Sequence, residues 1–339
     1  MFLFDIRRYW EVSMKHHVGR VFVATSVLCY CLLSTAAQTE VDNRSSVNAV
    51  DAANRALFYQ AIDHHSVQRD VFNASFYAEK MLVLSQVFLG AEYVGGSVGE
   101  GPFSKYDKDP LVRFDVFDCT TYVETLLAGV MSTSSAEFET NLMALRYQDG
   151  DVSFVSRNHF PSLDWFHNNQ DKLQDITPDV AGGTAQVAQT LIDKAAWYQH
   201  LSGDVLGCDA TTSNDCQRLL GQLKEEGRDF TPEPAYLPYV PLTALFIGTE
   251  RAVNQALLDR IPSGSVISMV RPDWPLKQWI GTNMNVSHQG IAIRKEGVLY
   301  LRHASLTYKK VIDESFVDYF SQYSPESSLK GFNVQILRY

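Results

Sequence analysis

Basic residues and cysteines are scarce in this chain. Lysine and arginine number 29 against 39 aspartates and glutamates, which gives a formal net charge of −10, and five of the 339 residues are cysteine. The deficit of positive charge argues against nucleic acid as a partner, because phosphate backbones are bound through clustered lysine and arginine. The length is sufficient for a large hydrophobic core in one elaborate domain or two.

Apolar runs long enough to span a membrane are also missing. The run at residues 21–33 has about 13 residues, whereas a spanning helix needs roughly 20. A basic segment containing Lys15 and Arg20 precedes it, and the small residues 34–37 follow it. This order is typical of a secretory signal peptide. We therefore expect residues 1–37 to be a signal peptide and the mature protein to be periplasmic, without stable membrane insertion; an uncleaved anchor is the alternative.

Zinc motifs are absent from the sequence. There is no HExxH, and the histidines between the leader and the last third of the chain show no ligand spacing. They are His64, His65, His159, His167 and His200. We therefore expect no metal and no other cofactor. A GxSxG pattern at residues 95–99 offers Ser97 as a nucleophile, but the Gly-Pro pair at 101–102 is incompatible with the helix that this motif requires.

Helical and extended patterns occupy different parts of the chain. Residues 38–50 are polar and small and predict a flexible lead-in. Helix-type spacing covers residues 51–89, 120–131, 136–147 and 184–202, and loop-type composition covers 203–240. Strand-type segments follow at 265–270, 287–294, 298–304 and 332–338. Helices first and strands later predict an α+β fold around an antiparallel sheet.

Cys119 stands where an extended segment gives way to an amphipathic helix. From Thr120 onward, apolar residues follow the i, i+3, i+4, i+7, i+8 spacing of one helical face, and Asp118 is a favourable N-cap residue. The thiol would then lie at a helix N-terminus, where unpaired N–H groups and the macrodipole lower a cysteine's pKa toward neutrality. The position predicts a nucleophile, with a buried structural cysteine as the alternative.

The other two cysteines beyond the leader, Cys208 and Cys216, bracket a polar, turn-like segment. In an oxidising compartment this pair could close as a disulfide. Cys119 is then left as the odd thiol in an exported protein, which indicates reactivity.

Two histidines are placed to serve a cysteine nucleophile, which needs an imidazole to accept its proton. His288 and His303 lie in consecutive strand segments joined by a short turn. A turn at residues 295–296 would pair them directly, a turn at 296–297 would set them diagonally on one face, and a three-residue loop would separate them. In the first two registers one imidazole can orient the other, as a catalytic base requires. The alternative is an ordinary hairpin with two half-buried histidines.

At these residues the chain resembles the NlpC-type papain-like cysteine hydrolases. Within them it is most similar to the N-acetylmuramoyl-L-alanine amidase-like family, long catalogued as a domain of unknown function. The matching stretches keep the family's order over roughly residues 80–338. They are Tyr93-Val94-Gly95-Gly96, Phe117-Asp118-Cys119-Thr120-Thr121-Tyr122-Val123-Glu124, Arg146-Tyr147 with Asp149-Gly150, Ser156-Arg157-Asn158-His159-Phe160 with Asp164-Trp165, Ser287-His288-Gln289-Gly290-Ile291-Ala292 and Leu301-Arg302-His303-Ala304-Ser305.

The resemblance implies a papain-like NlpC-type core, with the nucleophile helix packed on an antiparallel β-sheet and extra helices and loops around it. It implies hydrolysis of the amide between N-acetylmuramic acid and L-alanine, with peptidoglycan or a muropeptide as the partner. Cys119 would be the nucleophile, His288 the general base and acid, and His303 the orienting residue. N–H groups at the start of the Cys119 helix would stabilise the oxyanion.

Further roles follow from the same resemblance. Substrate contacts are expected from Gly95, Gly96, Arg157, His159 and Trp165. Glycine lets a backbone approach a sugar closely, and tryptophan stacks on sugar faces. Residues 51–339 are expected to form a single cysteine amidase domain, in which residues 203–230 look like an insertion relative to the family pattern.

Two other functions share most of these features. Papain-like wall hydrolases include endopeptidases that cut within the stem peptide, and a non-catalytic wall-binding protein could keep the fold without the chemistry. Cys119, His288 and His303 together favour an enzyme, because a binding module has no use for all three.

Overall fold

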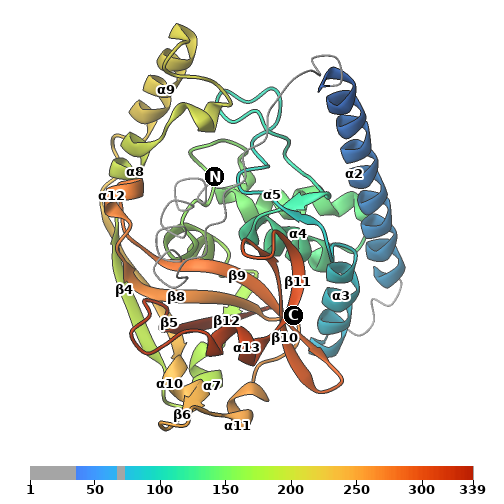
Figure 1. The fold of residues 1–339 in the computed structure, drawn as a ribbon, viewed down its shortest axis with the longest axis vertical. Coiled ribbons are helices and arrows are strands. Elements are labelled where there is room, and N and C mark those ends of the chain that lie inside the picture. Colours follow the sequence, from blue (N-terminus) through green and yellow to red (C-terminus); the bar gives the residue numbers. More distant parts are fainter. Residues whose placement is uncertain (1–35, 67–72, 339) are drawn as a thin grey trace, which may run out of the picture.

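The computed structural model describes residues 36–66 and 73–338, with side chains from residue 49 onward. Figure 1 shows a curled sheet with helices on both faces. The helices are α2 (Ala36–Ser66), α3 (Ala74–Gln86), α4 (Cys119–Met131), α5 (Phe138–Arg146), α6 (Phe166–Asn168), α7 (Thr177–Ala181), α8 (Lys194–His200), α9 (Asn214–Glu226), α10 (Leu242–Leu245), α11 (Gln255–Leu258), α12 (Lys277–Ile280) and α13 (Phe316–Ser321). Other helical turns are η1 (Ser135–Glu137), η2 (Gln148–Gly150), η3 (Pro161–Trp165) and η4 (Gly203–Leu206).

The strands are β1 (Glu92–Tyr93), β2 (Val116–Phe117), β3 (Leu173–Asp175), β4 (Gln186–Ile192), β5 (Glu233–Pro241), β6 (Phe246–Ile247), β7 (Ala252–Val253), β8 (Val266–Trp274), β9 (Met284–Lys295), β10 (Val298–Ser305), β11 (Lys310–Ser315) and β12 (Gly331–Leu337). The main sheet has the order β2-β1-β11-β10-β9-β8-β12-β5-β4, with β3 paired to β12 beside this path. Its pairs are antiparallel except β1 with β2. The predicted α+β class around an antiparallel sheet is therefore confirmed.

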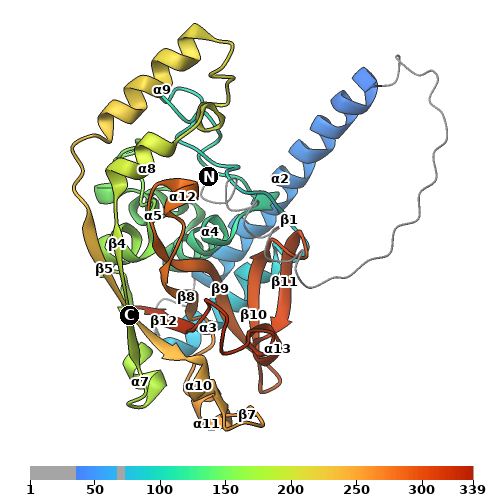
Figure 2. The ribbon, with the colours of Figure 1, turned by 60° about the vertical axis from the view of Figure 1, so that its left-hand side comes forward.

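Strand alternation divides the core between the two faces of the sheet. Ile291 and Ile293 of β9 face a cluster that contains helices α2 to α5, whereas the intervening Ala292 faces a cluster with α7, α10, α11 and α13. Helix α4 packs on β9 and β10 and against α3 and α5. Figure 2 shows α2 leaving this layer as a long projecting helix. Helix α4, which begins at Cys119, is thus held between a helical layer and the sheet.

The hairpin β9–β10 fixes the positions of the two predicted catalytic histidines. Val298 pairs with Lys295, and Glu296 and Gly297 form the turn with positive φ values of 50° and 82°. Positive φ at both turn residues matches the twist of the flanking strands. The turn at 296–297 is therefore the correct alternative, and it places His288 and His303 diagonally on one face.

Three expectations about local structure need correction. Residues 38–50 are part of helix α2 rather than a flexible lead-in. Residues 186–192 form strand β4, although the sequence predicts helix over 184–202, and only α8 is helical there. The region 203–240 contains α9 and β5 rather than loop alone. The prolines of β5 caused this last error, because proline removes a ladder donor and is tolerated only at some strand positions.

The segment 203–230, interpreted as an insertion, forms η4 and α9 and packs on α8 (Figure 1). A disulfide joins Cys208 to Cys216 at the start of α9, as the sequence predicts. The expected signal peptide lies almost entirely outside the described residues, which begin at Ala36. Within the described parts of the chain, no helix combines the length and the apolar character needed to cross a membrane.

Candidate active site

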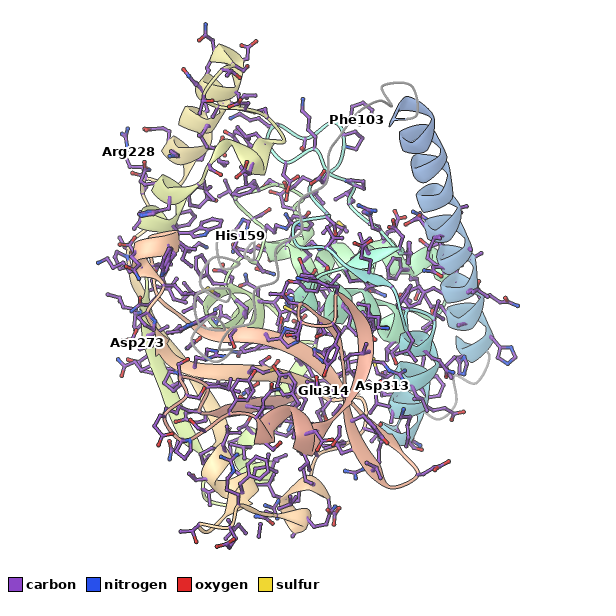
Figure 3. All side chains as sticks on the ribbon, in the orientation of Figure 1. Phe103, His159, Arg228, Asp273, Asp313 and Glu314 are labelled. Carbon is purple, nitrogen blue, oxygen red and sulfur yellow. A yellow bond between two sulfur atoms is a disulfide. The ribbon has the colours of Figure 1, made fainter. Side chains whose placement is uncertain are left out.

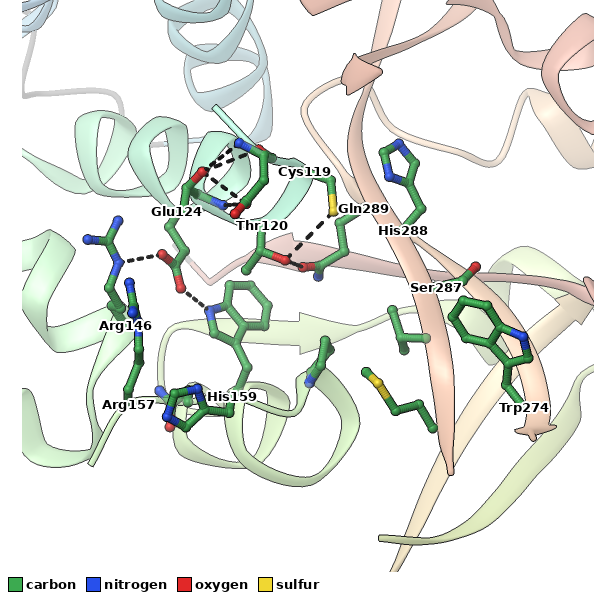
Figure 4. Close-up of a pocket in the computed structure, with 17 residues that line it drawn as sticks. Cys119, Thr120, Glu124, Arg146, Arg157, His159, Trp274, Ser287, His288 and Gln289 are labelled. Atoms are coloured by element: carbon green, nitrogen blue, oxygen red, sulfur yellow. Dashed lines mark hydrogen bonds and ion pairs between the residues drawn. The ribbon is translucent and has the colours of Figure 1, made fainter. Parts of the chain in front are cut away.

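A cavity opens between the N-terminus of α4, the segment 157–165 and the strands β8 and β9 (Figure 4). Its volume is about 840 Å³, including solvent at its mouth. Cys119 and His288 both line it, together with Thr120 and Gln289. The cavity therefore brings the predicted nucleophile and the predicted base into one space.

Cys119 is the first residue of α4, as its sequence context predicts. Asp118 is the N-cap: its carboxylate accepts the Thr121 N–H at 2.8 Å, and the Thr121 hydroxyl in turn accepts the Asp118 N–H at 3.0 Å. This reciprocal cap fixes the first turn of the helix. It leaves the N–H groups of Cys119 and Thr120 at the end of the helix, where no intrahelical carbonyl can reach them.

The thiol of Cys119 is less acidic than its place at a helix N-terminus predicts. Burial, and then the charge of Asp118, raise its pKa to about 12. Hydrogen bonds from the backbone N–H groups of Gln289 and Thr120 act in the opposite direction but are outweighed. Because the side chain is only 6% exposed, loss of hydration is the larger effect. The expectation of a pKa near neutrality is therefore wrong for the resting protein, in which the sulfur is a thiol.

His288 is the first member of a chain of three hydrogen-bonded groups. Its Nε2 lies 2.7 Å from Nδ1 of His303, and Nε2 of His303 lies 3.3 Å from a carboxyl oxygen of Glu314. Glu314 belongs to β11, next to β10 in the sheet (Figure 3). Three adjacent strands therefore contribute one group each.

These hydrogen bonds determine which nitrogen of each imidazole carries a proton. The ionised Glu314 carboxylate can only accept, so His303 donates from Nε2 and its Nδ1 becomes an acceptor when the ring is neutral. His288 then donates from Nε2, which leaves the lone pair of its Nδ1 without a proton. An imidazole in this tautomer is ready to act as a base through Nδ1.

The surroundings keep His288 neutral. Burial, the neighbouring His303 and the charge of Arg271 lower the pKa of His288 well below its usual value. Tyr319 of α13 packs on both imidazoles, with ring centroids 6.3 Å from His288 and 5.5 Å from His303. The resting site therefore pairs a neutral thiol with a neutral imidazole, and charge separates only when a reaction begins.

Three of the five predicted substrate contacts, Arg157, His159 and Trp165, line the cavity, but each of them interacts with other residues of the protein. Arg157 reaches Glu100 at 3.4 Å and Asp107 at 3.3 Å. Nε2 of His159 donates to the Phe154 carbonyl at 2.7 Å, and burial lowers the pKa of this imidazole. These interactions hold the segments 98–107 and 154–159 together beside the cavity.

Trp165 does not offer the open face that sugar stacking requires. Its side chain is 1% exposed, and its indole N–H donates to Glu124 at 3.2 Å. The same carboxylate accepts from Arg146 at 2.7 Å. Gly95 and Gly96 are not among the residues that line the cavity. The expected sugar-stacking role of Trp165 and the expected approach of the glycines to a ligand here therefore find no support in the geometry.

Several residues of the site escaped the sequence analysis. Glu314 lies outside the motifs, and no signal in the sequence points to it, because its contact with His303 depends on the pairing of β11 with β10. Gln289 could have been found as the neighbour of His288. Its side chain accepts from the Thr120 hydroxyl at 3.1 Å and donates to the Ser268 hydroxyl at 3.2 Å. It thereby ties the start of α4 to β9 and β8.

The fold and the cavity define an α+β protein with a cysteine at a helix N-terminus and an oriented histidine in one shared space. The model of the AmiA-like family, described as N-acetylmuramoyl-L-alanine amidase-like, matches residues 83–325. The chain belongs to this family. Membership supports a peptidoglycan amidase-like function. The matched range includes Cys119, His288, His303 and Glu314.

Solved structures are similar over most of the chain. The Legionella pneumophila protein LPG0564 is 36% identical, with 85% of this chain and 96% of that chain covered and a TM-score of 0.74. An N-acetylmuramoyl-L-alanine amidase from Bacteroides uniformis is 22% identical, with coverages of 78% and 99% and a TM-score of 0.53. A putative xylanase from Bacteroides fragilis is 23% identical, with coverages of 74% and 97% and a TM-score of 0.51. The last two likenesses show the fold alone. No curated protein matches the chain.

Proposed function

We propose that this protein is an exported, cysteine-dependent N-acetylmuramoyl-L-alanine amidase with an NlpC-type papain-like core. The observation that carries the proposal is the shared cavity of Cys119 and His288, with the imidazole oriented by His303 and Glu314. Family membership supplies the substrate class, and the name of the Bacteroides uniformis neighbour agrees with it. The leader-type N-terminal segment supports a periplasmic location for this reaction.

In the first half of the reaction, Nδ1 of His288 takes the proton of the Cys119 thiol as the sulfur attacks the carbonyl carbon of the lactyl group. Because the thiol pKa is about 12 at rest, proton removal and attack belong to one event rather than to a standing ion pair. The carbonyl oxygen becomes an oxyanion, and the N–H groups at the start of α4, which no intrahelical carbonyl reaches, stabilise it.

Collapse of this intermediate breaks the carbon–nitrogen bond. The protonated His288 gives its proton to the departing amino group of L-alanine, and a thioester remains on Cys119. Water then attacks the thioester with His288 again as the base, releasing the lactyl carboxylate and restoring the thiol. His303 and Glu314 stabilise the imidazolium that forms in both halves.

Digestion of soluble muropeptides, with products identified by mass spectrometry, tests the proposal. We expect the mature protein to release the N-acetylmuramic acid moiety and an intact peptide that begins with L-alanine. Cys119→Ala and His288→Ala should abolish this release. His200→Ala is the matched control, because His200 is an exposed histidine of α8 that does not line the cavity.

Other products would redirect the assignment. Cleavage inside the stem peptide, lost in Cys119→Ala, would identify an endopeptidase with the same nucleophile. Muropeptide binding without any product would identify a wall-binding protein. Release that survives Cys119→Ala but stops with a chelator would refute the cysteine mechanism.

A further inference from the structure

A second concavity lies across the η3 turn from the Cys119 cavity. Pro161 and Trp165 of this turn line the cavity, whereas Ser162 and Leu163 line the other side. We call this second space the β3–β5 groove, since residues of β3 and β5 form much of its wall. Its volume is about 1310 Å³, including solvent at its mouth, and it shares no lining residue with the Cys119 cavity.

The groove arises because two different strands pair with the same edge of β12. Strand β5 pairs with Gly331 and Phe332 of β12, and strand β3 pairs with its residues Gln335 to Leu337. The two strands diverge between these points. Asn333 holds the split open at its base, donating to Asp175 of β3 at 2.8 Å and to the Pro238 carbonyl of β5 at 3.0 Å. The concavity is therefore built into the sheet.

Gln335 presents an unused hydrogen-bond acceptor to this groove. Its side chain is 5% exposed and lines the groove, and its carbonyl oxygen has no hydrogen-bond partner among the described residues. A buried acceptor without a partner is unfavourable, because it has lost its hydration without replacement. A ligand that donates an O–H or N–H group would satisfy it.

Tyr236 of β5 adds a flat apolar surface to the same groove. Its side chain is 57% exposed, and its hydroxyl accepts from Gln189 of β4 at 3.4 Å, which holds the ring from the neighbouring strand. An exposed aromatic ring offers a broad face at a small cost in side-chain entropy. The C–H face of a pyranose ring matches such a surface.

The charged groups of the groove favour a neutral ligand. Asp175 accepts from the Thr177 N–H and from Asn333. Arg338 donates to the carbonyls of Gln170 and Leu173. Asp175 is thereby engaged within the fold, whereas Arg338 makes both contacts through Nε and remains exposed, so the groove carries charges of both signs. Glu233 is exposed and lines the groove, which disfavours an anionic ligand.

We propose that the β3–β5 groove is a second binding site, distinct from the Cys119 cavity, for a neutral oligosaccharide. One sugar ring stacks on Tyr236, and a hydroxyl or acetamido N–H donates to the Gln335 carbonyl oxygen. The natural ligand is a stretch of peptidoglycan glycan whose lactyl groups are still in amide linkage and therefore uncharged; this identity, but not the groove's preference for sugars, rests on the proposed function. The groove then holds the polymer while a neighbouring stem is cleaved.

Isothermal titration of the full chain carrying Cys119→Ala tests the proposal with three probes: a tetramer of N-acetylglucosamine, cellotetraose and a free stem peptide. We expect saturable binding of the acetylated tetramer. Tyr236→Ala should weaken it about tenfold, the loss of one aromatic stacking contact. Gln335→Met should weaken it several-fold. Val187→Ala is the matched control, because Val187 is 62% exposed on β4 and does not line the groove.

Equal binding of cellotetraose would support recognition of the pyranose ring, and preference for the acetylated tetramer would add recognition of the acetamido group. The proposal is overturned if the folded protein binds no tetramer, if it binds only the peptide, or if Tyr236→Ala and Gln335→Met both bind like the parent. These outcomes do not involve Cys119, so they can be separated from a failure of the amidase assay.

Discussion

At the scale of single residues, the candidate site depends on which nitrogen of each imidazole holds its proton. Glu314 sets the order from one end, because an ionised carboxylate accepts hydrogen bonds and cannot donate them. The order passes through His303 to His288. It ends at Nδ1 of His288, the nitrogen that would receive the thiol proton in the proposed reaction. A residue that touches neither substrate nor sulfur therefore positions the base.

Glu314→Gln should separate this positioning role from a structural one. An amide can donate as well as accept, so it no longer fixes the tautomer of His303, and its lack of charge destabilises the imidazolium. We expect kcat to fall about tenfold with little change in KM. Removal of a nearby negative charge should lower the pKa of His288 further, so the acid limb of kcat/KM should move to lower pH.

Rate–pH profiles on soluble muropeptides measure both effects. Asp318→Asn is the control, because it removes the same charge at an exposed position of α13. An unchanged profile for Glu314→Gln would show that the carboxylate does not act on the base.

The high thiol pKa gives a second prediction at this scale. With a pKa of about 12, Cys119 holds almost no thiolate near neutral pH in the absence of substrate. We expect iodoacetamide to label it more slowly than an ordinary exposed cysteine, with a rate that still rises above pH 9. Mass spectrometry of the labelled protein measures this rate. Rapid labelling at pH 6 would instead reveal a thiolate–imidazolium pair.

Sequence reasoning reached part of this site. The capping residue and the apolar spacing located Cys119 at a helix start. The possible turn positions of the hairpin limited the relative placement of His288 and His303 to three alternatives. It could not reach Glu314, because that contact depends on which strand lies beside β10. Burial of the thiol was also beyond reach, since it results from how β9 packs on α4.

At the scale of elements, α4 depends on a close approach to α2. A Cβ added at Gly129 would lie 2.5 Å from the tip of the Phe58 ring, which is buried in the core of the helical layer. Glycine at this position lets α2 approach the helix that carries Cys119.

Gly129→Ala should therefore destabilise the protein, although alanine has the higher helix propensity. We expect overpacking to cost about 1–3 kcal/mol, seen as a lower Tm in thermal unfolding. Gly221→Ala on α9 is the matched substitution, because a Cβ there meets nothing within 4 Å. It should be neutral or stabilise by up to about 1 kcal/mol. Equal Tm values for the two variants would contradict the proposed contact.

Strands in the last third were the most predictable, because short segments rich in valine and isoleucine are separated by turns that carry glycine. Strands β4 and β5 were not. Pro234 and Pro238 disguise β5, which pairs with β12 over only two positions and with β4 over its length. Val187 and Leu191 of β4 are four residues apart, a spacing that favours a helix. Both are exposed, so this spacing does not mark a buried face.

At the scale of the whole molecule, one ionic cluster attaches the segment 97–110 to the wall of the candidate site. Glu100 and Asp107 both lie near Arg157, and Glu100 is 7% exposed. Burial is the largest effect on Glu100 and raises its pKa to about 7, although Arg157 acts in the opposite direction.

This shift predicts how stability depends on pH. The pKa of Glu100 is higher in the folded state than the usual value of about 4.5, so the folded state binds more protons between these limits. The contribution of Glu100 to the free energy of unfolding is fully present below about pH 4.5. It is lost as the pH rises through 7, and the total loss is about 3 kcal/mol. Glu100→Gln should remove this decline from a plot of Tm against pH. Glu92→Gln, at an exposed position, should leave it intact; a decline that persists in Glu100→Gln would assign it to another group.

The η3 turn has a consequence for both concave sites. Its residues form a single partition, with Trp165 on one side and Leu163 on the other. If a ligand in one space moves this partition and so changes the affinity of the other space, thermodynamic linkage requires the second ligand to change the affinity for the first by the same factor. A glycan in the groove and a stem in the cavity would then report on each other's presence, and the five residues of η3 would set the sign of that cooperativity.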